Sequence, residues 1–128
     1  MQDKHLFEYA VIRIVPRVER EEFMNVGVIL YASKQKFLQS MFHLNEEHLR
    51  ALSGKTDIEE VKLHLLSFER ICMGTADGGP IARLDMASRF RWLTATRSTV
   101  VQSSKVHPGF CKDAMQALDQ LFEQMVRL

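Results

Sequence analysis

Two stretches of the sequence hold side chains that could bind a ligand, and the first of them is rich in arginine. Between residues 83 and 112 the chain has six Lys or Arg residues against one Asp. The planar guanidinium group binds carboxylates and phosphates through paired hydrogen bonds, and arginines interleaved with aromatic side chains also suit single-stranded nucleic acid. The segment therefore predicts a phosphate, nucleotide or nucleic-acid site, for binding or for hydrolysis, whose residues are Arg89, Arg91, Trp92, Arg97 and Ser98.

The same arginines also have a structural interpretation. They could form ion pairs within the chain, either with the acidic stretch at residues 19–22 or with Glu46 and Glu47. Ion pairs of this kind are common on protein surfaces and contribute little to stability. The sequence alone leaves both interpretations open.

The second stretch runs from residue 13 to residue 31 and is typical of an apolar strand, a charged turn and a second apolar strand. Arg13 interrupts an apolar run, and a half-buried charge needs a carboxylate, so one hypothesis is a polar pocket in which Arg13 faces Glu22. Asn25 and Gly27 fit this pocket, because glycine inside a strand often marks a bulge or the close approach of a ligand or backbone. The alternative is that Gly27 makes room for a crossing helix and that Asn25 bonds the backbone of the turn.

No catalytic or metal-binding pattern accompanies these residues. Gln102 and His107 follow the arginine-rich segment, but Ser98 and His107 lack the sequence context of a nucleophile and have no obvious acidic partner. The spacing of the histidines matches no metal-ligand motif. The sequence therefore favours a chain that is not an enzyme and that uses neither a metal nor a cofactor.

The elements that must position these residues begin with strands rich in β-branched and aromatic residues. The predicted strands are residues 7–15, 23–32, 37–44 and 99–102. Short polar turns join the first three, which predicts an antiparallel meander. On the second strand the even positions from Met24 to Ala32 are all apolar, so we expect them to share one buried face. The segment His107-Pro108-Gly109 predicts a turn.

Apolar residues at steps of three and four predict the helices. Helices are expected after the cap residue Asn45, after a capping box that begins at Thr56, and over residues 84–95. The last helix is predicted over residues 111–126, with an apolar stripe of Met115, Leu118, Phe122 and Met125. The predicted fold is α+β: a four-stranded, largely antiparallel sheet with three to four helices, the C-terminal one packed on the sheet.

Composition predicts one cytoplasmic domain that spans residues 1–128. Charged residues make up 26% of the chain and nearly balance to a net charge of +1, which argues against a wholly basic nucleic-acid binder and against disorder. The N-terminus lacks the regions of a signal peptide, and no apolar run is long enough to span a membrane. Cys72 and Cys111 fit no ligand or redox spacing, so we expect reduced thiols.

Taken together, positions in the two stretches resemble a bacterial family. The pattern consists of Arg13-x-x-Pro16, Glu22-Phe23-x-Asn25-Val26-Gly27-Val28, Trp92-Leu93-x-x-x-Arg97-Ser98, Gln102 and Val106-His107-x-Gly109. It resembles the family catalogued as domain of unknown function 3037, from about Tyr9 to the final helix. Glu21 and Thr96 depart from the pattern, where Gly and Pro are expected, and these departures affect local turn geometry.

The resemblance implies a function only by association. Such proteins are small bacterial products often encoded beside a protein similar to HipA-type kinases, the toxin halves of some toxin–antitoxin systems. This implies a non-catalytic module that binds or regulates a kinase-like partner. A third alternative is a homo-oligomer that forms through the exposed edge of a short sheet. The matching polar positions form either a site or a structural network, and they are Arg13, Glu22, Asn25, Arg97, Ser98, Gln102 and His107.

Overall fold

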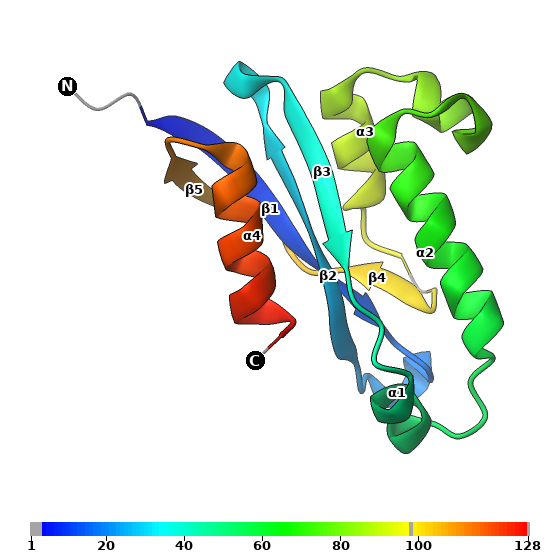
Figure 1. Cartoon of the computed structure of the whole chain (residues 1–128). Coiled ribbons are helices and arrows are strands. Elements are labelled where there is room, and N and C mark those ends of the chain that lie inside the picture. Colours follow the sequence, from blue (N-terminus) through cyan, green and yellow to red (C-terminus); the bar gives the residue numbers. More distant parts are fainter. Residues whose placement is uncertain (1–3, 98, 128) are drawn as a thin grey trace.

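The computed structural model describes residues 4–97 and 99–127, and it contains an antiparallel sheet between two helical layers (Figure 1). The strands are β1 (His5–Ile14), β2 (Met24–Ala32), β3 (Phe37–Phe42), β4 (Val101–Ser103) and β5 (His107–Cys111). The main helices are α1 (Glu46–Leu52), α2 (Ile58–Met73), α3 (Met86–Leu93) and α4 (Ala114–Met125). α4 covers one face of the sheet and α2 and α3 cover the other. The predicted α+β class, with the C-terminal helix on the sheet, is confirmed.

β1 is the central strand. β2 pairs with one side of it and β3 pairs with the far side of β2, so the predicted meander is confirmed. On its other side β1 pairs with β5 along residues 5–9 and with β4 along residues 12–14. The sheet therefore has one edge at β3 and another edge divided between β4 and β5.

The prediction of four strands missed β5, because its sequence was expected to form a turn. Pro108 lies within β5, opposite Glu8 of β1. Proline donates no hydrogen bond, but an edge strand tolerates it where its nitrogen faces away from the neighbouring strand. Gly109 lies opposite Phe7, whose ring occupies the space that a Cβ atom would need. The turn-forming residues are thus compatible with a strand here because the strand is at the edge.

A β-bulge in β2 reverses the face to which its side chains point. The pairing with β1 shifts by one residue between Asn25 and Gly27, which leaves Val26 as the extra residue. The side chains at the even positions therefore belong to two different cores. Met24 and Val26 lie under α2 and α3. Val28, Leu30 and Ala32 lie under α4. The prediction of one apolar face was wrong, because simple alternation does not continue through a bulge.

Gly27 follows the bulge and lies against β3. A Cβ atom at this position would lie 2.6 Å from the carbonyl oxygen of Met41 and would overlap the ring of Phe42. Phe42 in turn packs edge to face on Phe68 of α2, with 5.5 Å between the ring centroids. Gly27 therefore makes room for a neighbouring strand and its phenyl ring, and the expectation of a crossing helix was wrong.

The helices begin at side-chain caps, of which the sequence predicted Asn45. The cap residues, each accepting a hydrogen bond from a backbone N–H of the first turn, are Asn45, Asp57, Asp85 and Asp113. The cap of α2 is Asp57, one residue after the Thr56 expected from the capping box. α2 ends at Gly74, which adopts the left-handed conformation with φ of 69°.

α4 packs on the sheet with most of the predicted stripe, and the prediction fails only at the start of the helix. Its buried residues are Ala114, Ala117, Leu118 and Phe122. Met115 was expected in the buried stripe but is exposed. At the start of the helix Ala114 and Ala117 are buried in its place.

Candidate functional site

Three of the polar residues singled out in the sequence form one row across the sheet. Arg13 of β1 lies opposite Asn25 of β2 on one side and opposite Gln102 of β4 on the other. Directly opposite residues in antiparallel strands point to the same face, so the three side chains share the α4 face. We call Gln102, Arg13 and Asn25 the β1 row. The bulge is necessary for it, because without the shift Asn25 would not lie opposite Arg13.

Arg13 does not face Glu22, as the sequence hypothesis expected. Its guanidinium lies over the ring of Phe23, 4.2 Å from the ring centroid, in a cation–π contact. Glu22 pairs instead with Arg20 inside the hairpin turn. The aromatic partner replaces the expected carboxylate because Phe23 precedes Asn25 by two residues and so points to the same face.

Asn25 ties the row to the end of α4. Its side-chain nitrogen donates to the carbonyl oxygen of Met125 at 3.1 Å. The last carbonyls of a helix have no partner within the helix, so this amide satisfies one of them. The expectation that Asn25 bonds the turn backbone was therefore wrong, since its partner is 100 residues away in the sequence.

Two buried polar atoms of the row have no hydrogen-bond partner among the described residues. They are Nε of Arg13, which is a donor, and Oδ1 of Asn25, which is an acceptor. Buried polar atoms are nearly always paired, and leaving one unpaired costs about 1–3 kcal/mol. Both atoms belong to directly opposite residues, so this one point of the sheet carries an unsatisfied donor and an unsatisfied acceptor.

A hollow of about 530 Å³ opens beside the row, at the C-terminal end of α4. Besides Phe23 and Asn25, its polar lining is His43, Asn45, His48 and Arg127. We call it the α4-end hollow. Phe23 forms part of its wall and is 47% exposed, although its ring also contacts the partly buried Arg13. Aromatic residues and arginine are enriched at protein–protein interfaces.

The arginine-rich segment has partners within the chain. Arg91 of α3 makes two parallel hydrogen bonds, of 2.9 and 2.7 Å, with the carboxylate of Glu8 on β1, and these bonds raise the pKa of Arg91. Arg89 donates to the carbonyl oxygen of Leu84 at 2.6 Å. The structural interpretation had expected the acidic stretches at 19–22 and 46–47 as partners, and those partners were wrong.

Arg97 and Trp92 form a contact of their own after α3. The guanidinium of Arg97 lies 4.0 Å from the centroid of the Trp92 ring and donates to the Trp92 carbonyl. Burial lowers the pKa of Arg97. Together with Gln102 they line a hollow of about 140 Å³ between α2, α3 and β4. The structure thus brings Trp92 and Arg97 together, whereas the Gln102 side chain belongs to the opposite face of the sheet and Arg89 and Arg91 have partners elsewhere.

The two remaining candidates have different outcomes. His107 of β5 lies opposite Tyr9 of β1, with 5.4 Å between the ring centroids, which gives it a packing role at the edge. Ser98 lies outside the described residues. Across residues 4–97 and 99–127, no group of three or more His, Cys, Asp or Glu side chains could hold a metal ion. Over the same residues, no helix has the length and apolar character of a membrane span.

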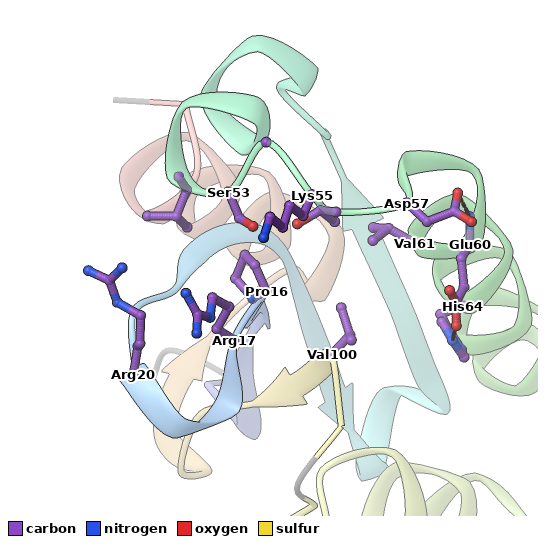
Figure 2. A pocket seen from close by; sticks show the side chains of 13 residues that line it. Pro16, Arg17, Arg20, Ser53, Lys55, Asp57, Glu60, Val61, His64 and Val100 are labelled. Atoms are coloured by element: carbon purple, nitrogen blue, oxygen red, sulfur yellow. Dashed lines mark hydrogen bonds and ion pairs between the residues drawn. The ribbon is translucent and has the colours of Figure 1, made fainter.

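Another hollow, of about 610 Å³, lies between the β1–β2 turn and the start of α2 (Figure 2). Arg17, Arg20 and Lys55 lie on one side of it, and Asp57 and Glu60 lie on the other. Arg17 already pairs with Glu19 at 3.1 Å. The hollow is lined by charges of both signs, and Pro16 is the one residue of the family pattern among its lining residues. The β1 row is therefore the better candidate site.

Two contributors to the candidate site were not among the residues predicted from the sequence. Phe23 was part of the quoted pattern but was not a candidate, although its spacing from Asn25 was a usable signal. The contact with the Met125 carbonyl could not be predicted from the sequence, because no side-chain pattern identifies which helix end approaches a strand.

The antiparallel sheet with helices on both faces defines an α+β protein, and its candidate site is the β1 row. A family model described as Protein of unknown function (DUF3037) matches residues 9–126. Since the match spans nearly the whole chain, the chain belongs to this family, and the resemblance seen in the sequence is confirmed. No curated protein and no solved structure matches the chain.

Proposed function

We propose that the chain is a non-catalytic, regulatory module that binds a protein partner through the β1 row and the α4-end hollow. The observation that carries the proposal is the unsatisfied pair formed by Nε of Arg13 and Oδ1 of Asn25. A peptide group offers one acceptor and one donor, so a partner's backbone matches both atoms at once. A lone phosphate would satisfy only the arginine.

Access to these atoms requires the Phe23 ring to move. The ring lies over the Arg13 guanidinium and is about half exposed, so a partner that turns it outward reaches the row. Side-chain rearrangements of this size are common when proteins bind one another. The row would then be completed by the partner's main chain and enclosed by the displaced aromatic ring.

The kinase-like neighbour implied by the family resemblance is the partner to test first. A tagged chain is purified from its native host, and co-purifying proteins are identified by mass spectrometry. We expect a HipA-like kinase in stoichiometric amount. A chain that is recovered without a partner and that turns over a substrate would contradict the proposal.

Substitutions test whether the β1 row is the contact. Phe23→Ala and Arg13→Gln should each weaken partner binding about tenfold or more, as truncation at the centre of an interface does. Phe110→Ala is the matched control, because Phe110 is 69% exposed on the distant strand β5. Thermal unfolding verifies that all three variants fold. Equal affinity of the Phe23 and Phe110 variants would place the interface elsewhere.

A second candidate function rests on the hollow lined by Trp92, Arg97 and Gln102. Under this alternative the chain binds a nucleotide or single-stranded nucleic acid, whose base stacks on Trp92 and whose phosphate contacts Arg97. Binding of a labelled oligonucleotide should then fall steeply with salt and disappear in Arg97→Ala. Absent or salt-independent binding would dismiss the alternative.

A further inference from the structure

The outer side of β3 is an open sheet edge. β3 has six residues, Phe37 to Phe42, with no proline and no charged side chain, and it pairs with β2 in a continuous register. Figure 1 views the sheet from this edge and shows helices over both faces but none across the outer side of β3. Natural sheets usually blunt such edges with charges, prolines or bulges, because unpaired backbone groups attract another strand.

The hydrogen-bonding groups on this edge can be assigned. His43, directly after β3, donates its N–H to the carbonyl oxygen of Val26 at 2.7 Å and so faces β2. Backbone groups alternate between the two sides of an antiparallel strand. The N–H and C=O groups of Leu38, Ser40 and Phe42 therefore point away from β2.

We propose that β3 pairs in antiparallel fashion with β3 of a second copy, about a twofold axis at Ser40. In this register Ser40 lies opposite Ser40 of the other copy, and Leu38 lies opposite Phe42 on both sides. All three outward-facing residues then form hydrogen-bonded pairs, whereas a register centred on Gln39 would pair only two of them with each other. The two sheets become one continuous sheet with the two α4 helices on the same face.

Charge supports a second copy as the occupant. Lys34 and Lys36 lie at the start of β3, and Glu46 and Glu47 open α1 shortly after its end. An antiparallel pair brings the basic end of each copy to the acidic end of the other. Opposite charges at both ends favour this alignment and disfavour a parallel one.

The mass of the full chain in solution tests the proposal. Sedimentation equilibrium should show twice the monomer mass of 14.8 kDa at high concentration. Ser40→Pro should raise the dissociation constant about tenfold or more, because it removes both hydrogen bonds of the central pair and proline is tolerated where the N–H faces outward. Ser40→Ala is the matched control: it removes the same hydroxyl but keeps the N–H, so it should still dimerise.

The register is tested separately by cross-linking. Gln39 and Met41 are opposite each other in the proposed register, as a pair without mutual hydrogen bonds whose Cα atoms lie about 4.5 Å apart, close enough for a disulfide. A mixture of Gln39→Cys and Met41→Cys chains should form mixed disulfides under mild oxidation, and neither variant alone should do so. Cross-linking of Gln39→Cys with itself would overturn the register. A chain that stays monomeric at the highest soluble concentration would overturn the proposal and leave the edge for an extended segment of another protein.

Discussion

The two edges of the sheet differ in how backbone pairing ends. At β3 the strand is continuous and uncharged, and its outer groups have no partner among the described residues. At the opposite edge the strand is divided into β4 and β5, and Ser104 between them bonds β1 with its side chain: its Oγ accepts from the N–H of Val11 at 2.8 Å. Pro108 then removes one N–H from β5. One edge is open to another strand and the other is closed to it.

The family pattern follows this difference. It includes Gln102, His107 and Gly109 on the closed edge but no residue of β3. On the closed edge His107 packs on Tyr9 and Gly109 accommodates the ring of Phe7. Much of the pattern there is thus explained by how the edge is built, which leaves Arg13 and Asn25 as the residues of the pattern that each have a buried polar atom without a partner among the described residues.

The largest expected loss of stability follows substitution of Gly27, which lies on β2 opposite the open edge strand β3. Gly27→Ala should lower the free energy of unfolding by about 3 kcal/mol, because the added Cβ meets the Met41 carbonyl, a backbone group that cannot rotate away. Urea unfolding measures the loss. Gly54→Ala is the control, since the nearest atom there is 3.9 Å away and no loss is expected. Equal stability of the two variants would show that β3 is not held as closely as the structure indicates.

Ser104 tests the closed edge. Ser104→Ala should cost about 2 kcal/mol, because it leaves the buried N–H of Val11 without an acceptor. Ser103→Ala should lower the free energy of unfolding by less. The Ser103 hydroxyl donates to a carbonyl oxygen, so its removal leaves no N–H without an acceptor. Chemical unfolding of the two variants gives the difference, and hydrogen exchange at Val11 should become faster only in the Ser104 variant.

Gly109 gives a smaller effect than Gly27, although both glycines lie under aromatic rings. In Gly109→Ala the Cβ meets only the side chain of Phe7, at the edge of the sheet, and the ring can shift. We expect a loss of about 1 kcal/mol. A loss as large as that of Gly27→Ala would mean that the closed edge is as rigid as the inner strands.

The sequence predicted the class of fold and the cap of α1 at Asn45 because these depend on local signals. Period-two apolar runs were sufficient for the first three strands, and apolar residues at steps of three and four were sufficient for the long helices. β5 was missed because proline and glycine have the same local signature in a turn and in an edge strand. The bulge was missed because one inserted residue changes every later face without changing the composition of β2.

For the candidate site, the residues were predictable but their contacts were not. Arg13, Asn25 and Gln102 were all candidates, yet their alignment depends on the bulge and on where β4 joins β1, and no spacing in the sequence encodes either. The predicted ion pair between Arg13 and Glu22 does not form, for the same reason. The hairpin turn pairs Glu22 with Arg20, and the reversed face places Phe23 against the guanidinium.

The smallest expected effect is a difference in thiol reactivity between the two edges, since each edge has a cysteine in or next to it. This comparison needs no substitution and leaves stability unchanged. Cys72 of α2 lies next to Ser40 of β3, and burial raises the pKa of its thiol to about 11. Cys111 is in β5 and is partly exposed, and its pKa is raised less strongly by burial and by Asp113.

Only the thiolate reacts with alkylating reagents, so at neutral pH Cys111 should be labelled first and Cys72 only after local opening. Raising the pH toward 9 should speed the labelling of Cys111 and leave Cys72 protected, as peptide mass spectrometry of labelled protein would show. Equal labelling rates would mean that the layer beneath the open edge opens as readily as the closed edge does.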